Sequence, residues 1–198
     1  MKFKLIVPIL LLAILAAGVW SGLTIYSPKE KDPSMQKAEF LKGGDFQITN
    51  GDIVFNLADL NGKVVLLYFG FTSCPDVCPT GLSVIKSAMT KLEGQADDIK
   101  VLFVTLDPER DNLSRLNEYL PFFDDRIVGL SGSMSELEAV TKKYGVYYKK
   151  VDSGSDSLGY SIDHSANFFI IDSRGSLAYV LDHSVDSAML AEIIRKTD

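Results

Sequence analysis

The sequence predicts an α/β fold in which helices flank a mixed central sheet. Two continuous apolar runs, residues 63–71 and 99–106, have the composition of buried central strands. Segments with helical spacing of apolar residues alternate with these runs, and the chain closes with two more strand-like segments and a helix. This order favours a mixed sheet, and 198 residues with 46% hydrophobic content support one globular domain of ordinary size.

The first half of the domain begins with a hairpin. Residues 46–49 and 53–55 are strand-like, and the Asn-Gly pair at residues 50–51 supplies the positive φ values that a tight turn needs. The central strand of residues 63–71 follows. A helix is expected over residues 79–92, because apolar residues recur there at intervals of three and four.

The second half continues the alternation of strands and helices. One helix is expected to begin at Ser133, where SMSE places an acid three residues after a serine cap, and to end at Gly145. The other expected strands are residues 99–106, 127–130, 146–151, 167–172 and 177–181. The other expected helices are residues 112–119 and 185–196.

An uncharged apolar run precedes the domain. Residues 5–23 (LIVPILLLAILAAGVWSGL) carry no charge, and a helix of that length, at about 1.5 Å per residue, spans the roughly 30 Å hydrocarbon core of a bilayer. Lys2 and Lys4 stand before the run, which favours a cytoplasmic N-terminus. We therefore expect residues 1–25 to be a single-pass anchor in a bacterial inner membrane, with the soluble domain in the periplasm.

A cleaved signal peptide is the alternative for this run. Such peptides have an apolar region of about 7–15 residues and an A-x-A-like cleavage site. Residues 16–18 (AAG) match that site poorly, and Trp20 suits a membrane interface. The segment is neither Arg-rich nor Ser-rich, which argues against a mitochondrial presequence.

A polar linker is expected between the anchor and the domain. It covers residues 26–42, where SPKEKDPSMQKAE mixes both signs of charge with two prolines, and the domain covers residues 43–198. The chain has 26 acidic and 20 basic residues, a formal net charge of −6. This acidity argues against a nucleic-acid partner, whose phosphates would be repelled.

The chemistry concentrates at Cys74 and Cys78, in the segment SCPDVCP. The segment follows the most apolar strand and precedes the first long helix, so the chain emerges there from a buried sheet. If the segment is wound like a helical turn, a spacing of four places both sulfurs on one side. The positive end of the helix dipole lowers a thiol pKa, and the thiolate is the form that binds metals or attacks disulfides.

Several interpretations of this pair are open. In the first interpretation, Cys74 and Cys78 are structural thiols that take part in no reaction and bind no metal. Thioredoxin-like oxidoreductases usually have two residues between their cysteines, and a proline before a later strand, where this chain has His164. Zinc sites take four ligands, and the chain has two Cys and two His in all. Two thiolates and one imidazole instead match copper, as Cu(I) in a three-coordinate arrangement.

The expected positions of His164, His183 and Asp107 indicate which of them lies beside the cysteines. His164 precedes a strand expected beside residues 63–71, so its ring can converge on the cysteines, whereas His183 is expected at the exposed end of an outer strand. Asp107 ends a central strand at the same edge of the sheet as Cys74. It either modulates the site from a second shell or docks a partner, or it caps a helix or pairs with a nearby cation such as Arg110.

Two further acids flank the candidate ligands. Asp163 precedes His164, and Asp76 lies between the two cysteines. We expect Asp163, with Asp107, in a second shell around the site, where a carboxylate modulates the charge felt by a bound ion.

These motifs together resemble the Sco/SenC family, membrane-tethered copper proteins that help assemble cytochrome c oxidase. The resemblance is carried in order by GGDF, GKVVLLYFGFTSCPDVCP, VTLDPERD, YGV and DHSANFFIID, and it covers residues 43–196. It implies a thioredoxin-like fold, an inner-membrane anchor, and copper as Cu(I) or Cu(II) bound by Cys74, Cys78 and His164. It also implies that the polar residues 149–161 form a mobile loop near the site.

The resemblance makes a copper metallochaperone the first functional hypothesis. Copper would come from an upstream donor protein and pass to the dinuclear copper centre of cytochrome c oxidase subunit II. A second hypothesis is a thiol-disulfide reductase, with Cys74 and Cys78 as the redox pair, that keeps the copper-ligand cysteines of the oxidase reduced. A third is a copper or redox sensor that uses the same residues.

Overall fold

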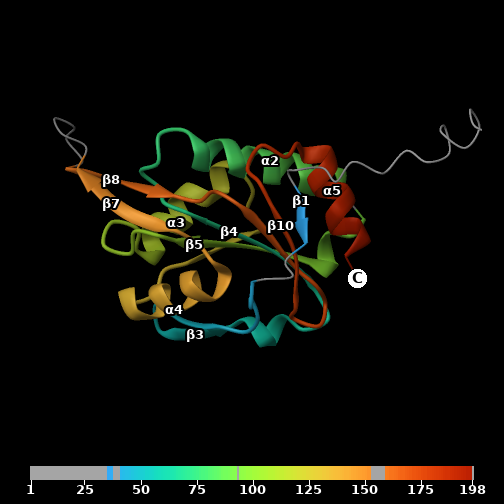
Figure 1. The fold of residues 1–198 in the computed structure, drawn as a ribbon, viewed down its shortest axis with the longest axis horizontal. Helices are drawn as coiled ribbons and strands as arrows, with labels where there is room; N and C mark the ends of the chain where they lie inside the picture. The colour runs from blue at the N-terminus through green and yellow to red at the C-terminus, as the bar shows by residue number, and fades with distance from the viewer. Residues whose placement is uncertain (1–34, 38–40, 93, 153–158, 198) are drawn as a thin grey trace, which may run out of the picture. The chain divides into compact units, whose positions relative to one another are not determined.

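A six-stranded mixed sheet lies at the centre of the computed structural model, which describes residues 35–37, 41–92, 94–152 and 159–197. Figure 1 shows α2 and α5 on one side of this sheet and α4 with the β2–β3 hairpin on the other. Across the sheet, the strands are β1 (Met35–Lys37), β10 (Leu177–Leu181), β9 (Phe168–Ile171), β4 (Val64–Gly70), β5 (Ile99–Thr105) and β6 (Ile127–Leu130). The helices are α2 (Val77–Lys91), α3 (Leu113–Tyr119), α4 (Met134–Tyr144) and α5 (Ser187–Lys196).

Strand β4 occupies the middle of the sheet. It pairs in parallel with β5 and antiparallel with β9, and β5 pairs in parallel with β6. Strands β10 and β1 extend the sheet antiparallel beyond β9. All seven residues of β4 are buried, because elements cover both faces of the sheet there. The α/β fold with a mixed sheet is therefore confirmed. The sequence of β4 is apolar throughout because both faces of this strand are buried.

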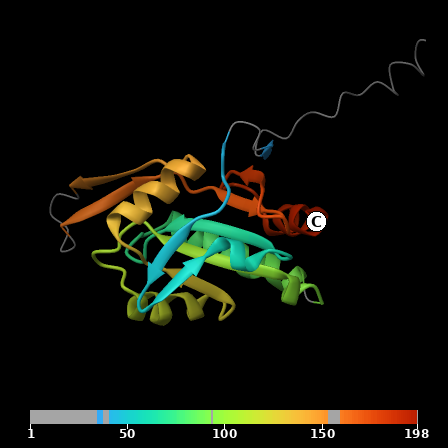
Figure 2. The ribbon, with the colours of Figure 1, turned by 90° about the horizontal axis from the view of Figure 1, so that it is seen from below.

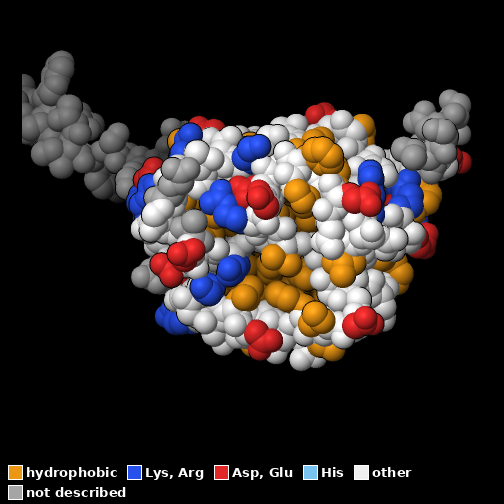
Figure 3. Space-filling view, turned by 180° about the vertical axis from the view of Figure 1, so that it is seen from behind, with side chains coloured by type: hydrophobic (Ala, Val, Ile, Leu, Met, Phe, Trp, Pro, Cys, Tyr) orange, Lys and Arg blue, Asp and Glu red, His pale blue; other side chains and the backbone are white. Residues whose placement is uncertain are grey.

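Two cores lie on opposite faces of the sheet, and β4 contributes alternate residues to each. Leu66 and Tyr68 face the core under α2, α3 and α5, whereas Leu67 and Phe69 face the core under α4. Figure 2, which is turned by 90° from Figure 1 and seen from below, shows helices on both sides of the sheet. On the surface, Figure 3 shows acidic and basic side chains near one another, with apolar side chains between them.

Local signals placed several elements correctly. The predicted hairpin is β2 (Gln47–Asn50) and β3 (Ile53–Asn56), and Gly51 at its turn has φ of 67°. Helix α4 has the predicted capping box, in which Ser133 and Glu136 bond each other's backbone N–H groups. Gly145 ends it in the left-handed region at φ 67°.

Two segments differ from the sequence expectations. The strand expected over residues 146–151 is present as β7 (Tyr148–Asp152), and it pairs antiparallel with β8 (Tyr160–His164) in a separate two-stranded sheet. The two strands take up both ends of the expected mobile loop of residues 149–161, and residues 153–158 of that loop lie outside the described residues. Residues 35–37, within the expected linker, form β1 along the edge of β10. Strands β8 and β1 were not expected for one reason, which is that backbone pairing to a neighbouring strand needs no apolar pattern.

The expected membrane anchor at residues 1–25 lies outside the described residues. Among the residues that are described, no helix combines the length and apolar character needed to span a membrane.

Candidate metal centre

The two cysteines lie where β4 gives way to α2, as the sequence predicts. The backbone N–H of Cys74 donates to the carbonyl oxygen of Phe71, which turns the chain at the end of the strand. The helix begins at Val77, two residues earlier than expected, so Cys78 lies in its first turn. Cys78 is fully buried, whereas Cys74 is half-buried and is followed by the exposed Pro75. One sulfur is thus enclosed by protein and the other lies near the surface.

His164 completes a cluster with the cysteines. It is the last residue of β8, and its Nε2 lies 3.4 Å from the Cys78 Sγ. The backbone N–H of Cys78 donates to the Cys74 Sγ at 3.4 Å. The ligand atoms of the three residues all lie within 4.8 Å of one another. The predicted convergence of His164 on the cysteine segment is therefore present in the structure.

The ring of His164 is held with one nitrogen toward the sulfurs. Its Nδ1 lies 3.1 Å from the carbonyl oxygen of Ser165, and because a carbonyl only accepts hydrogen bonds, Nδ1 carries a proton. In the neutral ring, Nε2 then has a free lone pair that points at Cys78. The ring also meets Phe71 edge to face, at 5.7 Å between centroids. Nε2 is thereby presented as a ligand atom.

The two thiols differ in acidity. A hydrogen bond from Cys78, with further ones from backbone N–H groups, lowers the pKa of Cys74 to about 4, although partial burial opposes this shift. The hydrogen bond to Cys74, together with burial, raises the pKa of Cys78 above its ordinary value. In the metal-free chain, Cys74 is therefore the thiolate and Cys78 is its hydrogen-bond donor.

A buried carboxylate that the sequence analysis did not single out fixes the cysteine segment. Asp111 is fully buried and accepts hydrogen bonds from the Thr72 backbone N–H (2.8 Å), the Thr72 hydroxyl (2.6 Å) and the Thr105 hydroxyl (2.8 Å). Its negative charge also contributes to the raised pKa of Cys78. The signal was present, because Asp107 and Asp111 are two acids four residues apart after a buried strand. Only the first was considered.

Asp107 is fully buried and serves a neighbouring contact. Its carboxylate pairs with the Arg110 side chain and accepts a hydrogen bond from the Tyr160 hydroxyl at 2.7 Å. The ion pair with Arg110 is the alternative that the sequence analysis weighed against a second-shell role. Asp107 thus acts on the β8 strand that carries His164, through Tyr160.

The side chains of the remaining candidates, Asp163, Asp76 and His183, are not part of the cluster of ligand atoms. Asp163 is exposed, and strand alternation puts it on the face of β8 opposite to Ile162 and His164. Asp76 is also exposed and makes no side-chain cap on α2. His183 is half-exposed beside Asp182, as its expected position at the end of an outer strand implies.

The donor set favours a soft metal ion. Two sulfurs and one imidazole nitrogen suit Cu(I), whereas structural zinc sites use four ligands. Within the described ranges, Cys74, Cys78 and His164 form the one group of three or more His, Cys, Asp or Glu residues close enough to share an ion. The residues present therefore fit a three-coordinate soft-metal site.

Comparisons with known proteins agree with this geometry. The family model of SCO1/SenC matches residues 34–197. An SCO2-like protein of Rickettsia felis is 40% identical over 148 residues, which cover 74% of this chain and 71% of the relative. The structure of Bradyrhizobium japonicum ScoI with copper bound superposes with a TM-score of 0.70 at 34% identity, covering 79% of this chain and 99% of that one. Yeast Sco1 with copper bound gives 0.69 at 32% identity, over 78% and 86% of the two chains.

Proposed function

This chain belongs to the SCO1/SenC family and has the thioredoxin-like α/β fold of the Sco structures, and from that premise we propose that it binds one copper ion through Cys74, Cys78 and His164. The observation that carries the proposal is the cluster itself, with all three ligand atoms within 4.8 Å. Similar Sco proteins have been solved with copper bound. Two thiolates and an imidazole are ligands that copper prefers.

The chain's own residues prepare this site before the ion arrives. The lowered pKa of Cys74 supplies one thiolate at neutral pH. Copper replaces the proton of Cys78, so binding releases a proton from the pair. The Nδ1 contact of His164 to Ser165 keeps Nε2 free as the third ligand.

The exposure of one side of the site supports a role in handing copper to another protein. Cys74 is half-buried and its neighbours Pro75 and Asp76 are exposed, so a partner protein can reach one of the ligands directly. We propose that the chain is a metallochaperone that receives copper from an upstream donor protein and delivers it to the dinuclear copper centre of cytochrome c oxidase subunit II. The resemblance to the Sco/SenC family supports this recipient.

The place of action is part of the same proposal. Residues 1–25 anchor the chain in a bacterial inner membrane, and the domain faces the periplasm, since Lys2 and Lys4 favour a cytoplasmic N-terminus. A reporter that is active only in the periplasm, fused after Asp198, tests this orientation. Activity of a cytoplasm-only reporter at the same position would reverse it.

The central experiment is metal analysis of the purified, reduced full-length chain. We expect close to one copper per chain, loss of tight binding in Cys74→Ser and Cys78→Ser, and weaker binding in His164→Ala. His183→Ala is the matched control, because this exposed histidine lies outside the cluster, and it should bind copper as the wild type does. Preferential loading with zinc, or no metal after exposure to both ions, would contradict the proposal.

A thiol-disulfide reductase is the second candidate, and the acidity of Cys74 favours it. The Cys74 thiolate would attack a partner disulfide, forming a mixed disulfide and releasing one partner thiolate. Cys78, after losing its proton to solvent, would then attack the Cys74 sulfur, forming the Cys74–Cys78 disulfide and releasing the partner's second thiolate. His164→Ala separates the two candidates. It removes a copper ligand but leaves the dithiol, so a reductase retains exchange activity while a metallochaperone loses copper affinity.

A further inference from the structure

The strand that presents His164 belongs to a hairpin apart from the main sheet. Among the residues that the structure describes, strands β7 and β8 pair only with each other, and Figure 1 shows the hairpin extending past the end of the six-stranded sheet. The two cysteines, in contrast, lie on the continuation of the central strand β4. The distance between His164 and the sulfurs therefore depends on how this hairpin is held against the rest of the domain.

One face of β8 makes the contacts that hold it. Tyr160, Ile162 and His164 alternate along this face, and Ile162 is buried in the core beneath α4. His164 meets the cysteines at one end of the strand. Tyr160 lies at the other end, roughly 13 Å away at about 3.3 Å per residue.

Tyr160 is clamped by the segment that follows β5. Its hydroxyl donates to the Asp107 carboxylate at 2.7 Å, and its carbonyl oxygen accepts a hydrogen bond from Arg110 Nη1 at 3.0 Å. The Arg110 guanidinium also lies over the Tyr160 ring, 3.8 Å from its centroid. Three different contacts thus fix the backbone, the ring and the hydroxyl of one residue.

Asp107, which accepts the Tyr160 hydrogen bond, is itself held in place by other contacts. Asp107 is fully buried, its backbone N–H donates to the Thr105 hydroxyl, and its carboxylate pairs with Arg110. The same Thr105 hydroxyl donates to Asp111, which holds Thr72 beside the cysteines. The segment after β5 therefore contacts both halves of the site.

We infer that Tyr160 is a positioning residue for the metal site, a latch that keeps the β7–β8 hairpin docked so that His164 faces Cys74 and Cys78. Ile162 fixes β8 in the core, whereas the ion pair that joins Lys150 of β7 to Glu109 is exposed to solvent. The Tyr160 contacts supply a second fixed point, and the strand between carries that constraint to His164. The inference rests on the proposed copper binding, because copper affinity is one of its readouts.

The first test measures copper affinity of the full-length chain by competition with a chelator. A hairpin that is docked only part of the time weakens apparent affinity in proportion to the docked fraction. We expect Tyr160→Phe, which removes only the hydroxyl, to bind copper about fivefold more weakly, and Tyr160→Ala to bind at least tenfold more weakly. Tyr179→Phe, at a partly buried tyrosine of β10, is the control and should leave affinity unchanged. Wild-type affinity in both Tyr160 variants would overturn the inference.

A double-mutant cycle shows whether Tyr160 acts through the histidine. In a His164→Ala background, Tyr160→Phe should weaken copper binding no further, because the residue it positions is already gone. Equal losses in both backgrounds would instead place the effect on the cysteines and overturn the inference. If His164→Ala alone leaves copper affinity intact, the proposed ligand set fails, a result distinct from failure of the latch.

Hydrogen exchange of the metal-free chain gives a readout that needs no copper. An isolated two-stranded hairpin is only marginally stable in water, so a hairpin that undocks should also lose its internal pairing. Tyr160→Phe should therefore speed exchange of the backbone amides of β7 and β8, while the amides of β4 keep their wild-type protection. Unchanged exchange in β8 would contradict a latch. Faster exchange throughout the domain would also contradict it, because that result shows global destabilisation.

Discussion

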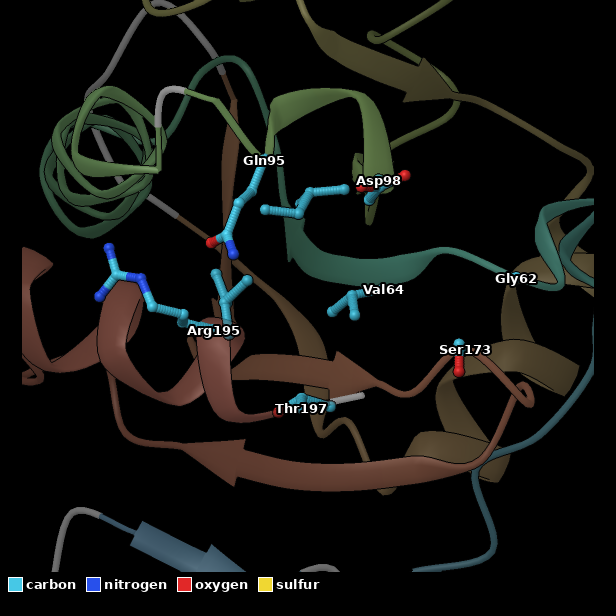
Figure 4. Close-up of a pocket in the computed structure, with 9 residues that line it drawn as sticks. Gly62, Val64, Gln95, Asp98, Ser173, Arg195 and Thr197 are labelled. Carbon is cyan, nitrogen blue, oxygen red and sulfur yellow. The ribbon is translucent and has the colours of Figure 1, made fainter.

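The two ends of the parallel strands β4 and β5 differ in what they do with polar side chains. At the carboxyl ends lie the cysteines and the buried carboxylates of Asp107 and Asp111. At the amino ends lies a cavity of about 230 Å³ lined by Val64, Ile99 and residues of the C-terminal segment, shown in Figure 4.

Two polar side chains around the cavity each donate to a single backbone carbonyl oxygen. The Thr197 hydroxyl donates to the Ile193 carbonyl in the preceding helical turn, and Arg195 donates to the carbonyl of Lys91 at the end of α2. At the carboxyl ends, by contrast, buried carboxylates accept several hydrogen bonds each. The contrast teaches that an open volume does not mark the functional end of this sheet, whereas converging donors and buried charges do.

Removal of the Asp111 carboxylate should give the largest loss of unfolding free energy. It tests whether substitutions at the carboxyl ends of β4 and β5 destabilise the protein more than substitutions at the amino ends. Asp111→Ala leaves the Thr72 N–H and the hydroxyls of Thr72 and Thr105 without their buried acceptor, so we expect a loss of about 3 kcal/mol in unfolding free energy. Urea denaturation monitored by circular dichroism measures it.

The matched variant at the amino end is Asp98→Ala. Asp98 lines the cavity and is exposed, so its replacement should change the unfolding free energy by no more than about 0.5 kcal/mol. Equal losses in the two variants would remove the distinction between the ends of the sheet.

A pair of glycine substitutions should give a smaller effect with different causes at the two ends. A Cβ at Gly70 would lie 2.9 Å from the Cys78 sulfur and 3.0 Å from the Phe103 ring, whereas one at Gly62 would meet nothing within 4 Å. We expect Gly70→Ala to cost about 2 kcal/mol through overpacking. Gly62→Ala should cost about 1 kcal/mol, because its φ of 89° suits glycine.

Thiol chemistry separates these two variants further. Gly70→Ala should change the rate at which the cysteines react with an aromatic disulfide reagent, because the Cys78 sulfur must move. Gly62→Ala should react at the wild-type rate. A wild-type rate in Gly70→Ala would show that the sulfur position does not depend on this close contact.

The rate at which Cys74 is alkylated should depend on pH in a way that reports the acidity of this thiol at the carboxyl end of β4. The hydrogen bond from Cys78 lowers the pKa of Cys74 from 9.0 to about 4, so the thiolate persists as pH falls from 9 and is lost only near pH 4. The rate of Cys74 alkylation by iodoacetamide, followed by mass spectrometry, should therefore halve near pH 4. In urea the midpoint should return to about 9. A folded-state midpoint near 9 would show that Cys78 does not hold this thiolate.

Local sequence patterns predicted much of the fold. The bounds of β6 and β10 match the expected residues 127–130 and 177–181, and the cap residues of α4 are the predicted Ser133 and Gly145. Each of these signals depends on residues within one turn or one strand. Strand β7 was expected over residues 146–151, but β8 was not, because only Ile162 of its five residues is buried and no alternating apolar pattern distinguishes it from a loop.

The sequence by itself determined the cysteine half of the site. Cys74 and Cys78 stand four residues apart at a strand-to-helix junction, so local winding alone brings their sulfurs together. His164 was expected to converge on the cysteines from its place before a strand, but its contact distance and the roles of Asp111 and Tyr160 depend on the tertiary structure. His164 meets Cys78 across 86 residues, Asp111 meets Thr72 across 39, and Tyr160 meets Asp107 across 53. Such contacts depend on strand order and on the docking of a hairpin outside the main sheet, and neither is encoded by the spacing of residues along one segment.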